Sequence, residues 1–84
     1  MSLENLKKAL KEGKVVFGTE RTLKMMKDGK VKEVVICSNC KEAAEKEIMH
    51  DADVLGIKVV KAKENNEELG ILCKKPFSIS VLCY

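Results

Sequence analysis

The sequence lacks any apolar run close to the roughly 18 residues that a membrane-spanning helix needs. Residues 1–14 mix leucine with lysine and glutamate, so they do not resemble a secretory signal peptide. Proline occurs once, and no low-complexity tract, internal repeat or Gly/Ser-rich linker divides the 84 residues. We therefore expect one cytoplasmic domain over residues 1–84, with no membrane partner.

Groups of catalytic residues are also scarce. His50 is the only histidine, and no serine or cysteine nucleophile is predicted near it. The acidic side chains of residues 42–53 occur among lysines, as on a solvated helix surface, and form no isolated pair of carboxylates. A domain of this length buries too little surface to enclose a deep active site. These absences predict a protein that is not an enzyme and that uses no cofactor, metal ion or small-molecule substrate.

The four cysteines fit a reducing compartment better than a secreted disulfide framework. Cys37 and Cys40 have the C-x-x-C spacing of redox dithiols and of half a zinc site. A zinc ion would need two more ligands from Cys73, Cys83 and His50, which form no second close pair. The simpler interpretation places Cys37 at the end of a buried strand and Cys40 in the first turn of a helix. A thiol-disulfide oxidoreductase using Cys37 and Cys40 is the alternative.

Hydrophobic periodicity predicts four helices. Ser2 is expected to cap the first helix, over residues 3–12, and Thr19 to cap the second. Gly56 is expected to end the third helix, and Asn65 or Asn66 to cap the fourth. The buried face of the third helix is predicted to contain Ala44, Ile48, Ala52 and Leu55.

Short runs rich in β-branched residues predict four strands between these helices. The expected strands cover residues 14–18, 33–37, 57–62 and 78–83. Strands separated by helices require crossover connections, which place helices on both faces of the sheet. The sequence therefore predicts an α/β fold, a three-layer α/β/α sandwich with a four-stranded mixed sheet.

Charge is distributed unevenly along the chain. Residues 7–32 contain nine basic and three acidic side chains, a balance of +6. Residues 33–53 contain six acidic side chains and two lysines, a balance of −4. This polarity suggests a basic face for a polyanion, and ordinary solvated helix faces are the other explanation.

The strand-turn-helix segment at residues 17–24 is a candidate phosphate site. Gly18 allows another backbone to approach closely, and the helix start at Thr19 presents unpaired N–H groups with a partial positive charge. Arg21 and Lys24 add side-chain donors one turn apart. A plain helix cap with solvated charges explains the same spacing, and the glycine count matches neither a P-loop nor a dinucleotide fingerprint.

A second cluster, residues 74–78, lies between the fourth helix and the last strand. Phe77 is one of only three aromatic residues. It is suited either to stack on an unpaired base while Lys75 meets a phosphate, or to plug the edge of the core. Loops converge at one end of such a sheet, so we expect this cluster beside Gly18 and Asn39.

Several segments, in their order and spacing, resemble a known family over nearly the whole chain. They are Gly18-Thr19 with Thr22 and Lys24, Val34-Val35-Ile36, Asn39, Leu55-Gly56-Ile57, Glu68-Leu69-Gly70 and Phe77. The chain resembles the kink-turn RNA-binding superfamily of ribosomal proteins, and within it the branch of large-subunit ribosomal protein thirty of archaea and eukaryotes.

The resemblance implies a non-enzymatic protein that binds a sharply bent RNA internal loop as a structural component of the large ribosomal subunit. Its partner would be large-subunit ribosomal RNA, its location the cytoplasm on the ribosome, and its free form a monomer. A free kink-turn-binding regulator outside the ribosome is the alternative.

The resemblance also implies roles for individual residues. Gly18 would allow close backbone approach, Asn39 would reach the RNA from its loop, and Phe77 would cover an extruded nucleotide. Thr19, Arg21 and Lys24 would contact bases or phosphates. Glu20 stands where many relatives have a different residue, and it would either accept hydrogen bonds from guanine amino groups or turn away from the phosphates.

Overall fold

The computed structural model describes residues 3–84, so the predicted cap at Ser2 lies outside the described residues. Helices and strands alternate along the chain in the predicted order. The helices are α1 (Leu3–Glu12), α2 (Thr19–Lys27), α3 (Glu42–Leu55) and α4 (Asn66–Leu72). The strands are β1 (Val16–Phe17), β2 (Glu33–Ile36), β3 (Lys58–Lys61) and β4 (Val81–Cys83).

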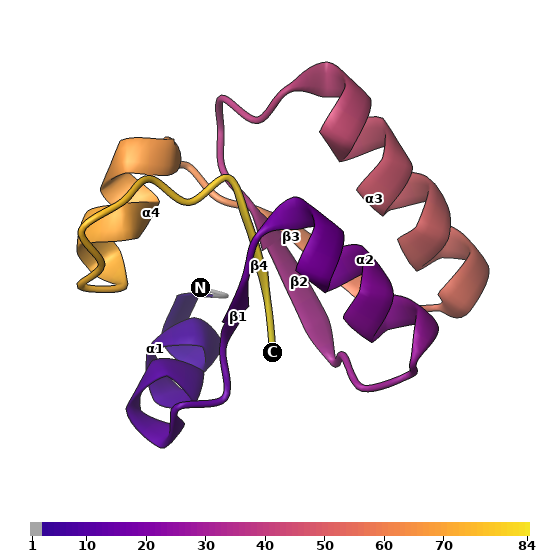
Figure 1. Ribbon diagram of the computed structural model, residues 1–84, viewed down its shortest axis with the longest axis horizontal. Coiled ribbons are helices and arrows are strands. Elements are labelled where there is room, and N and C mark those ends of the chain that lie inside the picture. The colour runs from indigo at the N-terminus through magenta and orange to yellow at the C-terminus, as the bar shows by residue number, and fades with distance from the viewer. Residues whose placement is uncertain (1–2) are drawn as a thin grey trace.

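The four strands form one mixed sheet in the order β1-β4-β2-β3. Strands β2 and β3 are parallel, whereas β4 lies between β1 and β2 and runs antiparallel to both. Figure 1 shows α2 and α3 on one face of the sheet and α1 and α4 on the other. The predicted three-layer α/β/α sandwich is therefore confirmed.

Strands β2 and β4 form the centre of the molecule, and every residue of both is buried. Val35 is paired with Leu82, and both contribute to the apolar cluster under α1 and α4. Val34 is paired with Cys83, and both contribute to the cluster under α2 and α3. Successive strand residues point to opposite faces, so these short strands supply both halves of the core.

Helix α4 starts at a reciprocal capping box. The Asn65 Oδ1 atom accepts a hydrogen bond of 2.8 Å from the Glu68 backbone N–H, and Glu68 Oε1 accepts one of 3.0 Å from the Asn65 N–H. Two N–H groups that the first turn would leave unpaired are thereby satisfied. Of the two predicted caps, Asn65 is the one used.

Three local predictions are wrong. The N-cap of α2 is Gly18, because its carbonyl oxygen already accepts the Thr22 N–H, so Thr19 is the first helical residue. Cys40 precedes α3, which begins only at Glu42 after an extended residue. Leu55, expected on the buried face of α3, is 46% exposed because that face ends one turn earlier.

All four strands are shorter than expected, and β1 and β4 differ most from the prediction. Strand β1 is two residues long, and β4 begins only at Val81. The Ile79 N–H donates to the Asn66 carbonyl oxygen at 2.9 Å, so Ile79 bonds to the start of α4 instead of to a neighbouring strand. The loop from residue 74 to residue 80 is therefore longer than the hydrophobic pattern suggested.

Candidate nucleic-acid interface

Three segments that carry predicted site residues meet at one end of the sheet. Strands β1 and β2 both end there, and β4 begins there. In Figure 1 this is the upper end, where the start of α2, the loop between β2 and α3, and the loop between α4 and β4 lie together. The predicted convergence of Gly18, Asn39 and the Phe77 loop is thus present in the fold.

Gly18 joins β1 to α2 with a backbone conformation that suits glycine alone. Its φ of 108° and ψ of 147° lie in a region that other residues almost never adopt. Its N–H donates to the Val81 carbonyl oxygen at 2.9 Å, and its carbonyl oxygen accepts the Thr22 N–H at 3.0 Å. A Cβ atom there would meet no other atom within 4 Å, so conformation and not space requires the glycine.

No side chain caps α2, so the N–H groups of its first turn have no side-chain partner. Such a helix start carries a partial positive charge and binds anions. Arg21 and Lys24 are exposed on the same helix, one turn apart. The start of α2 therefore offers backbone and side-chain donors to a phosphate.

A pocket of about 390 Å³ opens beside this helix start, and we call it the α2 pocket. One side is formed by Gly18, Thr19 and Arg21, and the other by Phe77 and the residues leading into β4. None of the described residues that line it is acidic. Four of the predicted site residues thus surround one hollow.

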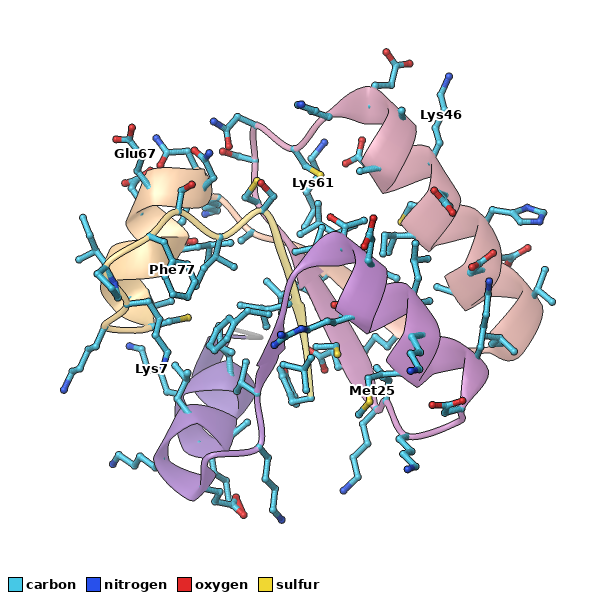
Figure 2. All side chains as sticks on the ribbon, in the orientation of Figure 1. Lys7, Met25, Lys46, Lys61, Glu67 and Phe77 are labelled. Carbon is cyan, nitrogen blue, oxygen red and sulfur yellow. The ribbon has the colours of Figure 1, made fainter. Side chains whose placement is uncertain are left out.

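Phe77 is held at the rim of this pocket by a second aromatic ring. The rings of Phe17 and Phe77 meet edge to face, with centroids 6.3 Å apart and an interplanar angle of 81°. The Lys75 ammonium lies 5.4 Å from the centroid of the Phe17 ring, within cation–π range. Phe77 remains 51% exposed, so it stays accessible to a ligand although it packs against Phe17. Figure 2 shows Phe77 on the loop that crosses α4.

Asn39 braces the site from behind instead of lining the pocket. Its Nδ2 donates to Asn66 Oδ1 at 3.0 Å, and its Oδ1 accepts the Asn66 backbone N–H at 2.9 Å. The Asn66 carbonyl oxygen in turn accepts the Ile79 N–H, and Ile79 lines the α2 pocket. Asn39 therefore ties the β2–α3 loop to α4 and, through α4, to the Phe77 loop.

Gly70 fixes the position of Phe77 by allowing two segments to touch. A Cβ atom on Gly70 would overlap the carbonyl oxygen of Phe77, so any larger residue would push the loop away from α4. Neither this contact nor the Asn39–Asn66 pair was predicted from the residues. The available signal was a glycine inside a short helix, which is unfavourable unless something packs closely against it.

The remaining predicted site residues lie around the pocket without lining it. Glu20 and Lys24 are exposed on α2. Lys75 lines a different pocket, between α1 and α4, and is linked to the α2 pocket through Phe17. The structure therefore gathers Gly18, Thr19, Arg21 and Phe77 at one place and arranges the other four nearby.

The surroundings of Cys40 do not favour a reactive thiol. Burial raises the pKa of the Cys40 thiol, and the neighbouring Cys37 and Glu45 raise it further, with only partial opposition from Lys61. A reactive thiol needs a lowered pKa, and a helix start beside it is the usual cause. Cys40 lies before α3 and not in its first turn.

The described residues offer neither a metal site nor a membrane-spanning helix. Within residues 3–84, no group of three or more His, Cys, Asp and Glu side chains is placed to hold a metal ion. Over the same range, none of the helices has both the length and the apolar character required to cross a membrane.

Comparison with known proteins gives consistent matches over most of the chain. Residues 2–84 match the ribosomal protein L7Ae/L30e/S12e/Gadd45 family. The large ribosomal subunit protein eL30 of Sulfurisphaera tokodaii is 44% identical over 77 residues, which cover 92% of this chain and 73% of that protein. The eL30 protein of Archaeoglobus fulgidus is 35% identical over 77 residues, covering 92% of this chain and 85% of that protein.

Solved structures share the fold at lower identity. The 15.5kD RNA binding protein of Giardia lamblia superposes with a TM-score of 0.82 at 22% identity, covering 98% of this chain and 71% of that one. A protein of unknown function from Bacillus halodurans superposes with a TM-score of 0.83 at 21% identity, covering 89% of this chain and 74% of that one.

Proposed function

Because the chain belongs to the ribosomal protein L7Ae/L30e/S12e/Gadd45 family, we propose that it is a non-enzymatic RNA-binding protein of the large ribosomal subunit. Its target is a sharply bent internal loop of the kink-turn type in large-subunit ribosomal RNA. The names of its relatives, large ribosomal subunit protein eL30 and an RNA binding protein of the same fold, support this assignment. The protein acts in the cytoplasm on the ribosome and is a monomer when free.

The observation that carries the proposal is the α2 pocket. An uncapped helix start, a guanidinium and a half-exposed phenylalanine surround one hollow, and the lining residues that the structure describes include no acidic side chain. RNA that is unpaired or sharply bent presents groups that suit this pocket. Its phosphates are negatively charged, and its unstacked bases can stack on an aromatic ring. A compact anion alone would not need the ring of Phe77.

Each residue then has a distinct role. The first N–H groups of α2 and the Arg21 side chain bind phosphate, and Gly18 keeps the approach free of a side chain. Phe77 stacks on an extruded base while Lys75 neutralises a phosphate beside it. Thr19 supplies a hydroxyl to the RNA at the first turn of α2.

The outer residues complete the contact. Lys24 reaches a second phosphate one turn farther along α2. Glu20, exposed on the same turn as Arg21, accepts hydrogen bonds from guanine amino groups. Asn39, which is exposed, reaches the RNA from the β2–α3 loop with the amide hydrogen and the lone pair that its hydrogen bonds to Asn66 leave free.

Replacing Arg21 and Lys24 together by alanine tests the proposal. We expect weaker binding to a kink-turn RNA, and a slope of log affinity against log salt that is smaller by about 1.4 to 1.8 if two phosphate contacts are lost. Fluorescence anisotropy at several salt concentrations measures both quantities.

The matched control replaces Lys46 and Lys58 by alanine, which removes the same charge from α3 and β3. This control should bind almost as the parent does. If the Arg21→Ala, Lys24→Ala variant keeps the affinity and salt slope of the parent, the start of α2 is not the RNA-binding surface. A parent protein that binds kink-turn and unbent duplex RNA equally would refute the proposed target.

A further inference from the structure

A second pocket, of about 510 Å³, lies between α1 and α4, and we call it the α1–α4 pocket. Its apolar lining includes Leu10, Val15, Phe17 and Leu72. Four lysines, Lys7, Lys11, Lys74 and Lys75, also line it, and none of the lining residues whose side chains the structure describes is acidic. Figure 2 shows Lys7 extending from α1 toward α4. The pocket therefore combines an apolar surface with a concentration of positive charge.

These lysines are available to a ligand. Lys11, Lys74 and Lys75 are exposed, and none of them forms an ion pair with any side chain described in the structure. Four ammonium groups around one hollow repel one another, which makes an anionic occupant favourable. The apolar lining requires that the occupant also carry a flat or hydrophobic group.

Lys74 adds an independent observation. It is the one described residue other than glycine with a positive φ, at 57°. Two backbone hydrogen bonds close the end of α4 here. The Lys74 N–H donates to the Ile71 carbonyl oxygen, and the Lys75 N–H donates to the Gly70 carbonyl oxygen. Glycine is the usual residue at the position that Lys74 occupies in this helix-ending motif. A lysine there is strained relative to glycine, so the fold itself would be at least as stable without the side chain.

The two pockets lie on either side of one shared lining residue, Phe17. Its ring contacts Phe77 on the side of the α2 pocket and the Lys75 ammonium on the side of the α1–α4 pocket. A nucleic-acid strand that leaves the α2 pocket past Phe77 therefore meets the four lysines next.

We propose that the α1–α4 pocket binds an unpaired segment flanking the RNA internal loop, with a base against the apolar lining and its phosphates on the lysines. This inference rests on the proposed function and extends its contact surface to α1. RNA fits better than an acidic protein segment, because it supplies a flat base and a phosphate at every nucleotide. Stacking and charge, and not base sequence, govern the contact, so it is tolerant of sequence.

The test compares two RNAs that share one kink-turn. The first is the minimal internal loop, and the second carries about ten unpaired nucleotides at one end, a length within the site sizes of small single-strand-binding domains. Extensions on the 5′ and the 3′ strand are both made. We expect one of them to tighten binding to the parent several-fold at moderate salt.

The variant for this test combines Lys11→Ala with Lys74→Gly. It should bind the minimal RNA as the parent does but lose the gain from the extension, with a salt slope on the extended RNA that is smaller by about 1.4. Its thermal midpoint should equal or exceed that of the parent, because glycine relieves the left-handed conformation. The control is the Lys46→Ala, Lys58→Ala variant, which should keep the gain.

The outcomes separate this inference from the proposed function. If the parent fails to bind the minimal kink-turn, the proposed function is wrong. If the parent binds it but neither extension tightens binding, the α1–α4 pocket does not hold flanking RNA. The inference is also overturned if the gain in affinity survives in the Lys11→Ala, Lys74→Gly variant. A competition experiment gives the last outcome: an acidic peptide that abolishes the gain as readily as single-stranded RNA, at equal charge concentration, would overturn the inference too.

Discussion

The interior of the sheet and its loop end are built in different ways. In the interior, β2 and β4 bury every residue, and apolar packing on both faces supplies the stability. At the loop end, the predicted site residues are almost all exposed, and their positions depend on backbone conformations and hydrogen bonds such as those of Gly18 and Asn39. Stability and binding therefore reside in different residues.

This separation has a physical reason. An apolar side chain stabilises the fold in proportion to the surface that it removes from water, so it is useful only where it is buried. A phosphate or a base binds only to groups that remain accessible, which contribute little to folding. The two regions meet at β4, whose first residue, Val81, is buried in the core and also lines the α2 pocket.

The largest effect is expected from Ile48→Ala in the interior. Ile48 is fully buried on α3 in the cluster under α2 and α3, so its truncation should lower the free energy of unfolding by about 2 to 5 kcal/mol. Urea denaturation followed by circular dichroism measures this loss. The RNA affinity of the folded fraction should be unchanged.

Leu55→Ala is the control on the same helix, because Leu55 is nearly half exposed. Its cost should be much smaller than that of Ile48→Ala. If Ile48→Ala weakened RNA binding by more than its unfolded fraction explains, the core and the loop end would be coupled and the separation would fail.

Phe77→Ala is the converse test at the loop end. If the ring stacks on a base, its removal should cost about 1 to 3 kcal/mol of binding free energy. Stability should change little, because Phe77 is 51% exposed and packs edge to face against Phe17 at the rim of the pocket. Anisotropy titrations and urea denaturation on the same samples give both values.

Ile71→Ala provides a matched control, because Ile71 is 76% exposed on α4 and lines neither pocket. It should alter neither affinity nor stability measurably. A folded Phe77→Ala variant that binds RNA as tightly as the parent would assign Phe77 to packing against Phe17 alone.

The interior was the more predictable region. Apolar runs and turn residues were sufficient to predict the order of the elements and a cap at Asn65 or Asn66, because these features depend on neighbours close in sequence. The mixed sheet followed from the alternation of helices and strands. The family prediction is confirmed as well, since it rested on the spacing of several short segments. The placement of β4 between β1 and β2 could not be derived, because strand order depends on tertiary packing.

The loop end was predicted in outline and not in detail. The convergence of Gly18, Asn39 and the Phe77 loop followed from the topology of an α/β sandwich. The pairing of Asn39 with Asn66 and the contact of Gly70 with Phe77 join residues from different elements, and no periodicity reports such contacts. The sequence therefore predicted Asn39 as an RNA contact but not its hydrogen bonds to α4.

The smallest predicted effect concerns a polar pair at the edge of the interior. The Tyr84 hydroxyl donates a hydrogen bond of 2.8 Å to Glu33 Oε1, and Glu33 is only 6% exposed. Tyr84→Phe removes this donor from a buried carboxylate and should lower the free energy of unfolding by about 1 kcal/mol near neutral pH. Glu33 begins β2, whereas the α2 pocket lies at the end of that strand, so RNA affinity should be unchanged.

The same pair predicts a pH dependence whose sign is fixed. Burial raises the pKa of Tyr84, and the Glu33 carboxylate raises it further, so the folded protein holds the phenolic proton at a pH where the unfolded chain has released it. The parent should therefore lose stability as the pH rises above about 10, the ordinary pKa of tyrosine, and its advantage over Tyr84→Phe should shrink. Because the sequence has one tyrosine, tyrosinate absorbance follows this ionisation directly. Ionisation at the ordinary tyrosine pKa in the folded protein would show that the Tyr84–Glu33 hydrogen bond is absent in solution.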